Sequence, residues 1–137
     1  MAKTNIRWYS RQTINKLSRF LRQRMAIVAL LMVNRTKGLI TTSNLGGTNP
    51  SQPGQPPHSG TGALRNSISY QTRTGLSSVS IAYGVFNGPA AAYARRLELG
   101  FSGIDGKGRN YNQAPRPFLN NATLLNKAAI LRIIRRG

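Results

Sequence analysis

Few residues of this sequence could take part in acid–base or nucleophilic catalysis. The 137 residues contain one His, two acidic residues and no Cys. His58 lies in a Pro- and Gly-rich stretch, and Glu98 and Asp105 are not the close pair of carboxylates that glycoside hydrolysis requires. There is no cluster of metal ligands and no Walker-type phosphate loop, and without Cys there are no disulfides, thiolate metal sites or Cys nucleophiles. We therefore expect a protein that is not an enzyme, with no catalytic residues, metal or cofactor.

The chemistry that the sequence does offer is the binding of anions by Lys and Arg. Twenty basic residues face two acidic ones, which gives a formal net charge of +18. Two carboxylates allow few internal ion pairs, so we expect a polyanion, an acidic partner or a large assembly to compensate the charge. No RNA-recognition strand motif, zinc finger or helix-turn-helix is recognisable in the sequence. The charge therefore favours contact with phosphates without readout of bases.

A long amphipathic helix is predicted over residues 8–36. Its apolar stripe follows the i, i+3, i+4 spacing from Ile14 to Leu31, and its C-terminal part is apolar all round, which predicts burial by neighbours. The opposite face is cationic. Together with the end of the chain, it supplies the residues that we expect to face DNA or a partner. These are Arg11, Lys16, Arg19, Arg22, Arg132, Arg135 and Arg136.

Arg24 interrupts the apolar stripe of this helix. A buried Arg needs a partner, because an unpaired buried charge costs several kcal/mol. Glu98 is one of only two carboxylates in the chain, so an Arg24–Glu98 pair is one prediction, and contact with a neighbouring subunit is another. Alternatively, Arg24 extends to the helix edge and keeps its guanidinium in water.

The rest of the chain alternates between loops rich in Pro or Gly and short helices and strands. Residues 38–60 contain four Pro and show no periodic spacing of apolar residues, which predicts an extended loop. Residues 61–100 predict a short helical turn capped by Thr61, a β-hairpin and a helix that ends at Gly100. Residues 101–116 predict a second, flexible loop. A helix over 117–136 follows, with a buried stripe from Phe118 through Leu125 to Ile133.

These elements predict a single α+β domain over residues 1–137, with a long N-terminal and a C-terminal helix packed on a small antiparallel sheet. The apolar run at residues 25–33 is shorter than the roughly 20 residues that a membrane span needs. No small-residue cleavage site follows it. We therefore expect neither a signal peptide nor a membrane partner.

Three stretches in this order carry a resemblance to a known family. They are SQPGQPPHSGTGALRNSI at 51–68, YARRLELG at 93–100 and APRPFLNNA at 114–122. With the long helix and the hairpin, they resemble the neck or tail-completion (head–tail joining) proteins of tailed bacteriophages over residues 8–136. The resemblance implies a structural virion protein, made in the host cytoplasm, that forms a ring, commonly six-fold. Such a ring joins the head connector or adaptor to the tail proteins, and DNA passes through its lumen without sequence-specific contacts.

Carried over to this sequence, the resemblance implies architecture and subunit contact rather than a reactive site. The matching positions are Thr61, Gly62, Leu64, Arg65, Ser67 and Ile68 at the loop-to-strand junction, Tyr93, Glu98 and Gly100 in the middle helix and its stop, and Pro117, Phe118 and Leu119 at the start of the last helix. The loop at 38–60 would be an arm that reaches an adjacent subunit or ring and becomes ordered on assembly.

The charge of +18 is more than we expect of every member of such a family. This charge fits a lumen lined with Arg and Lys around DNA, and it fits equally well the binding of an acidic neighbouring protein. The alternative function is a monomeric, sequence-independent nucleic-acid-binding protein of ribosomal or nucleoid type. That role would not require the family-like motifs after Ser51.

Overall fold

The structure is a computed structural model that describes residues 11–40, 51–58, 60–75 and 78–136. It has four helices and two antiparallel two-stranded sheets, which confirms the predicted α+β class. In chain order the elements are α1 (Arg11–Leu39), α2 (Ala63–Ser67), β1 (Ser69–Thr74), β2 (Val79–Gly84), α3 (Pro89–Leu99), β3 (Phe101–Ile104), β4 (Asn110–Gln113) and α4 (Leu119–Arg135).

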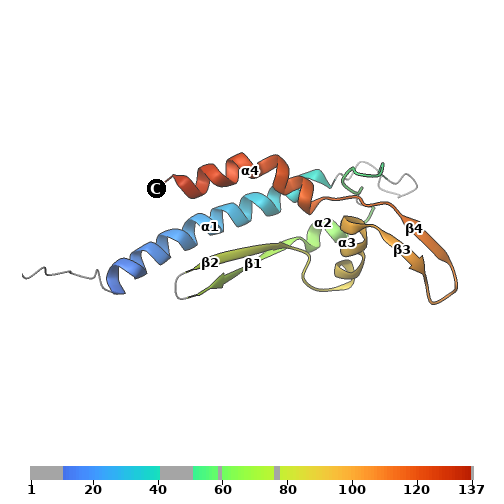
Figure 1. The fold of residues 1–137 in the computed structure, drawn as a ribbon, viewed down its shortest axis with the longest axis horizontal. Helices are drawn as coiled ribbons and strands as arrows, with labels where there is room; N and C mark the ends of the chain where they lie inside the picture. The colour runs from blue at the N-terminus through green and yellow to red at the C-terminus, as the bar shows by residue number, and fades with distance from the viewer. Residues whose placement is uncertain (1–10, 41–50, 59, 76–77, 137) are drawn as a thin grey trace, which may run out of the picture.

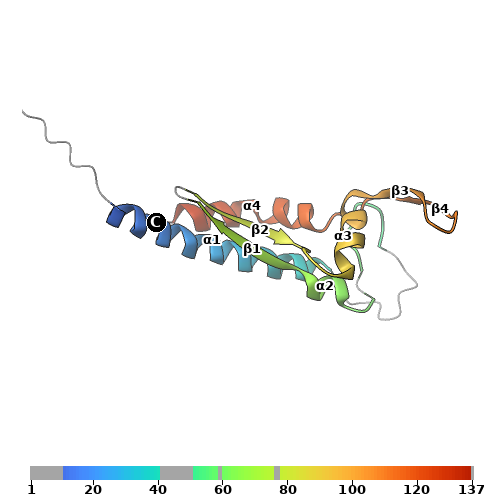
Figure 2. The ribbon, with the colours of Figure 1, turned by 90° about the horizontal axis from the view of Figure 1, so that it is seen from below.

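The described part of the molecule is elongated along α1 (Figure 1). Helix α4 lies along one side of α1, and the β1–β2 hairpin lies along another (Figures 1 and 2). The start of α1 and the end of α4 lie at the same end of the molecule, whereas the β3–β4 hairpin lies at the opposite end (Figures 1 and 2). Residues far apart in the sequence therefore meet at each end.

The core sits around the C-terminal half of α1. One cluster joins this half of α1 to α2, α3 and the residue that precedes α4, and its members are Val33, Ile40, Leu64, Ile68, Ala94 and Phe118. A second cluster joins Val28 and Met32 to Ala122 of α4. Buried Thr36 satisfies its hydroxyl by donating to the Met32 carbonyl oxygen at 2.7 Å, so this hydroxyl is paired within the core.

Helix α1 confirms the predicted long helix, but its apolar stripe is only half buried. Residues 8–10 of the prediction lie outside the described residues. Val28 is in the core, whereas Ile14 and Leu17 are exposed, because the layers that cover α1 pack against its C-terminal half. The expected burial all round that half is also wrong, since Ile27 and Leu30 are 50% and 52% exposed.

The buried face of α4 matches the predicted stripe except at Leu125. Phe118 and Ala122 are fully buried, as expected, but Leu125 is 72% exposed. Ile133 packs against the second core cluster as expected, and Ile130, which lies outside the predicted stripe, packs there as well. The helical spacing of apolar residues does not by itself decide between Leu125 and Ile130, because both sides of α4 carry apolar residues at that spacing.

The first hairpin is confirmed, with β1 and β2 paired antiparallel and Thr72 opposite Ile81. The predicted half-buried alternation holds for β2, in which Ile81 and Tyr83 face the helices. It is wrong for β1, all six residues of which are exposed. Helix α1 packs less against β1 than against β2, so the side chains of β1 stay exposed.

Two predicted loops contain more structure than expected. Residues 101–116, predicted as a flexible loop, include the β3–β4 hairpin. Residues 41–50 and 59 of the predicted arm lie outside the described residues, yet residues 51–58 dock on their own chain. The Gly54 N–H donates to the Pro115 carbonyl at 2.9 Å, Arg116 Nε donates to the Ser51 carbonyl at 2.9 Å, and Ser51 is only 6% exposed.

Candidate anion-binding grooves and assembly surfaces

Glu98, on α3, binds the start of α4. Its Oε2 accepts the main-chain N–H groups of Phe118 and Leu119 at 2.8 and 3.0 Å, and its Oε1 accepts that of Asn120 at 2.8 Å. The first N–H groups of a helix have no partner within the helix, and the helix dipole favours a negative charge there. Glu98 of α3 therefore caps α4. This contact links the stretch YARRLELG at 93–100 to the stretch APRPFLNNA at 114–122.

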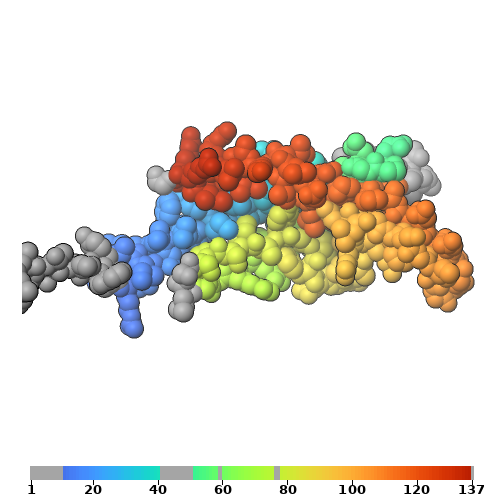
Figure 3. All heavy atoms as spheres, in the orientation of Figure 1, coloured from blue at the N-terminus to red at the C-terminus, as the bar shows by residue number. Residues whose placement is uncertain are grey.

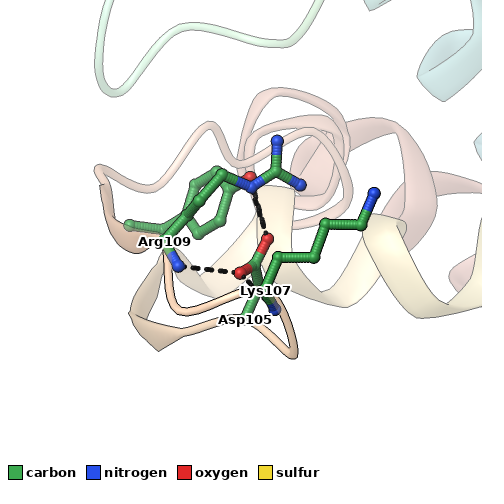
Figure 4. A network of polar contacts seen from close by, with 4 residues as sticks. Asp105, Lys107 and Arg109 are labelled. Carbon is green, nitrogen blue, oxygen red and sulfur yellow. Dashed lines mark hydrogen bonds and ion pairs between the residues drawn. The ribbon is translucent and has the colours of Figure 1, made fainter.

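Asp105 closes the turn of the β3–β4 hairpin (Figure 4). Its Oδ1 accepts the main-chain N–H groups of Lys107 and Arg109, both at 2.9 Å, and its Oδ2 pairs with Arg109 Nε at 2.8 Å. These bonds, first of all the one from the Arg109 main chain, lower the pKa of Asp105 below its usual value. The carboxylate thereby orders a segment that the sequence pattern predicts to be a flexible loop.

The predicted pair between Arg24 and Glu98 is wrong. Glu98 is held at the start of α4, and the Arg24 guanidinium lies over the Phe20 ring of its own helix, 5.0 Å from the ring centre. Arg24 is half-buried, which matches the alternative in which the side chain extends along the helix edge. Arg24 thus has no carboxylate partner among the described residues.

Three of the predicted basic residues line one groove beside α1. Arg11, Arg19 and Arg22 surround a volume of about 660 Å³, which Asn15 and Gly75 also line. These three arginines lie on one face of the helix, where they can contact phosphates. Lys16, predicted with them, is exposed but does not line this groove.

The other predicted basic residues line a second groove on α4. Arg132, Arg135 and Arg136 surround about 440 Å³ together with Ala128 and Leu131. Because the end of α4 lies beside the first half of α1, both Arg-lined grooves are at the same end of the molecule (Figure 1). The tertiary structure thus brings together two basic segments that are about 110 residues apart in the printed sequence.

These arginines have no acidic partner in the part of the chain that the structure describes. The ion pair found there is Arg109–Asp105, and the other carboxylate, Glu98, binds main-chain N–H groups. Since the sequence contains no third acidic residue, the positive charge of the two grooves is left for an external anion.

The described chain also leaves large apolar side chains uncovered in several places. On α1 these include Ile14, Leu17, Ile27 and Leu30, and on α4 they include Leu124, Leu125, Leu131 and Ile134. Leu99 and Ile104 are exposed near the far hairpin, at 65% and 71%. Isolated exposed apolar residues are ordinary, but runs of them along helix faces are typical of surfaces that pack against other chains.

The positions named from the family resemblance fall into the core and its connections. Leu64, Ile68 and Phe118 belong to one core cluster, with Leu119 partly buried against it. Gly62 precedes α2 with a φ of 79°, and the Ser67 hydroxyl donates to the Leu64 carbonyl at 2.7 Å.

The remaining motif positions lie on or near the surface. The Thr61 hydroxyl accepts the Ala63 N–H at 3.3 Å, but Gly62, not Thr61, holds the cap position of α2. Arg65 and Pro117 are half-buried, and Tyr93 is exposed. None of these side chains comes together with others as a reactive group.

Gly100 ends α3, as predicted, and its conformation requires glycine. Its φ is 77°, a region that side chains disfavour, and a Cβ there would lie 2.9 Å from the Gln113 carbonyl oxygen. This close approach lets the chain leave α3 directly into the β3–β4 hairpin.

An aromatic and Arg-rich pocket of about 430 Å³ lies between α3 and the β3–β4 hairpin, and the sequence patterns did not predict it. Arg96 stacks on Phe101 at 4.4 Å and Arg109 on Tyr111 at 5.7 Å, each measured to the ring centre. The alternation of Arg and aromatic residues over 93–111 is the signal that could have indicated it.

Two further properties bear on function. Among the helices of the described residues, none combines the length and the hydropathy that a membrane span requires. Those residues also contain no group of three or more His, Cys, Asp or Glu side chains that could hold a metal ion. Comparison of the chain with protein-family models, with curated proteins and with solved structures found no match.

Proposed function

We propose that this protein is a structural component of the head–tail junction of a tailed bacteriophage. In this role, copies of the chain form a ring between the head connector or adaptor and the tail proteins, and DNA passes through the lumen. The resemblance of residues 8–136 to neck and tail-completion proteins supplies this role, and the number of copies that it implies is commonly six. No catalysis is part of the proposal.

The observation that carries the proposal is the use of both carboxylates inside the fold. Glu98 caps α4 and Asp105 closes a hairpin turn, so the arginines at one end of the molecule have no side-chain carboxylate partner among the described residues. A ring repeats that end in every subunit and so multiplies its field around a central axis. Arg11, Arg19 and Arg22 would then hold the phosphates of DNA without reading its sequence.

The uncovered apolar faces favour a ring over the alternative of a monomeric nucleic-acid-binding protein. A monomer would leave Ile27 and Leu30 of α1 in water, each at least half exposed. Contact between neighbouring subunits would remove such surfaces from water, at a gain of about 25 cal/mol per Å² of apolar area. The elongated shape also gives each subunit a long flank to place against the next (Figure 3).

Light scattering after size exclusion, over a salt series with and without short duplex DNA, tests the proposal. A discrete multimer that persists at high salt is expected, because apolar contacts are not screened. A monomer at every salt concentration that binds DNA only at low salt would support the alternative function instead. Co-purification with the connector and tail proteins tests the ring further, because some rings assemble only with their neighbours.

The DNA contact has its own matched variants. Arg11→Gln, Arg19→Gln and Arg22→Gln together should reduce the slope of log affinity against log salt by about 0.9 for each phosphate that the protein no longer neutralises. The control replaces Arg73, Arg95 and Lys107 with Gln, which removes the same charge from positions outside the groove. An equal decrease in affinity in both triple variants would mean that the groove has no special part in binding DNA.

A further inference from the structure

The outward face of α4 combines an apolar stripe with a basic rim. Leu124, Ala128 and Leu131 follow one another at helical spacing on the side away from Ala122, which is buried against α1. Leu124 is 64% exposed and Leu125 beside it is 72% exposed. Helix α4 forms the upper surface of the molecule in Figure 3, and no other described element lies over it there.

Three arginines surround the C-terminal half of this stripe. The groove on α4 is lined by the apolar residues Ala128 and Leu131 and by Arg132, Arg135 and Arg136. Apart from its arginines, the α4 groove is lined by apolar residues alone, whereas the α1 groove is lined by Ile14 together with the polar residues Asn15 and Ser18. An occupant of the α4 groove must therefore offer both apolar side chains and negative charge.

A second copy of this chain does not meet that requirement. The whole sequence has two acidic residues, and both already bind groups of their own chain. Any copy brought to α4 would add positive charge next to three arginines, which is unfavourable. DNA meets only half of the requirement, because phosphates satisfy arginines but leave the leucines without an apolar partner.

We propose that the outer face of α4 binds an acidic amphipathic helix of another protein. Apolar residues at positions i, i+3 or i+4, and i+7 of that helix would cover Leu124, Ala128 and Leu131, as in other complexes of a helix with a groove. Its Asp or Glu residues would pair with Arg132 and Arg135, whose guanidinium groups can hold a carboxylate through two hydrogen bonds. The distance from Leu124 to Arg135 along the axis is about 16 Å, so about three helical turns of the partner suffice.

One of the two basic grooves is thereby assigned to a protein partner, and the α1 groove is left to DNA. The acidic helix is a partner for the proposed junction protein, but its binding does not depend on ring formation or on DNA binding. Mass measurements can refute the ring while α4 still binds an acidic helix, and the reverse result is equally possible.

Fluorescence anisotropy with synthetic peptides tests the inference on the full-length protein. The probe is a labelled 16-residue helical peptide, a length of about four turns, with Leu on one face and Glu beside it. One matched peptide replaces each Leu with Ser and keeps the charge, and another replaces each Glu with Gln and keeps the apolar face. Both matched peptides should bind about tenfold more weakly or worse, since the site needs both features.

Variants of the protein locate the binding site. Leu124→Ser with Leu131→Ser should weaken the acidic peptide about tenfold and leave the affinity for duplex DNA unchanged. The control, Leu17→Ser with Leu99→Ser, changes two exposed leucines elsewhere and should leave peptide binding unchanged. Thermal unfolding followed by circular dichroism checks that all variants are folded, and the peptide comparison on the unaltered protein does not depend on any of them.

Three results would overturn the inference. If the peptide with Ser in place of Leu binds as tightly as the acidic amphipathic peptide, charge alone attracts it. Equal peptide binding by the Leu124→Ser, Leu131→Ser variant would place the site elsewhere. Leu-dependent binding to phosphatidylglycerol vesicles without Leu-dependent peptide binding would identify α4 as a membrane-surface helix instead.

Discussion

Replacing Glu98 tests whether the contact between α3 and α4 stabilises the fold as its geometry indicates. The Glu98 carboxylate accepts three main-chain N–H groups, of which those of Phe118 and Leu119 are partly buried and that of Asn120 is exposed. In Glu98→Ala the two partly buried groups lose their acceptor, at about 1.5 kcal/mol each, whereas water can replace the acceptor for the exposed one. The total decrease in the free energy of unfolding should be about 3 kcal/mol.

Glu98→Gln should cost less, because one oxygen remains. If the amide oxygen takes the place of Oε2, the bonds to Phe118 and Leu119 persist, and the main changes are the removal of the charge at the helix start and of the bond to Asn120. These changes amount to about 1 kcal/mol. For a chain of this size, each kcal/mol lowers the melting temperature by about 3–4 °C. We therefore expect a decrease of about 10 °C in Glu98→Ala and about 4 °C in Glu98→Gln.

Thermal and urea unfolding followed by circular dichroism measures these effects. Asp105→Asn is the matched control, because it makes the same change in net charge at the other acidic residue, which is in a hairpin turn outside the core clusters. Its melting temperature should stay within about 2 °C of that of the unaltered protein. The reasoning is refuted if Glu98→Ala melts together with Asp105→Asn, because the three bonds would then contribute nothing to stability.

The other predictions concern single groups and use the same unfolding measurements or NMR. Gly100→Ala should destabilise the protein by more than about 1 kcal/mol, because its φ is 77° and a Cβ would lie 2.9 Å from a carbonyl oxygen, whereas Gly106→Ala meets no atom within 4 Å and should be nearly neutral. Tyr83→Phe should cost about 1 kcal/mol, because the hydroxyl donates to the Leu119 carbonyl at 2.8 Å; an unchanged unfolding midpoint in urea would contradict this. The pKa of Asp105 is lowered in the folded state, so its stabilisation of the hairpin is complete above its usual pKa and is lost as the pH falls through the lowered one. Amide chemical shifts in the hairpin should follow that titration, and a midpoint at or above the usual value for Asp would refute it.

The sequence was sufficient to predict those parts of the structure that depend on neighbouring residues. The α+β class, the helical nature of α1 and α4 and the β1–β2 hairpin follow from period, turn residues and propensity, which act over a few residues. The stop of α3 at Gly100 is predictable for the same reason, since glycine alone adopts its backbone conformation easily. The excess of 18 positive charges is also certain from the sequence, because charge is a property of composition.

The hairpin within residues 101–116 is an intermediate case. Its turn residues, Asp105 through Gly108, favour a flexible loop when only the glycine content of the stretch is considered. The structure shows that the Asp105 carboxylate satisfies main-chain N–H groups in that turn and holds the two strands in register. Asp and Gly in a short segment favour a tight turn as readily as a loop, and the weak strand propensity of the flanking residues hides the strands.

Only the tertiary structure decided which faces are buried and which charged groups meet. Both sides of α4 carry apolar residues, so the packing of Ile130 rather than Leu125 against the core depended on the shape of α1 and β2. Glu98 has several chemically suitable partners, and the docking of α3 against the start of α4 selected main-chain N–H groups rather than Arg24. The meeting of the α1 and α4 grooves at one end is likewise a consequence of packing, because contacts between residues far apart in the chain leave no local pattern in the sequence.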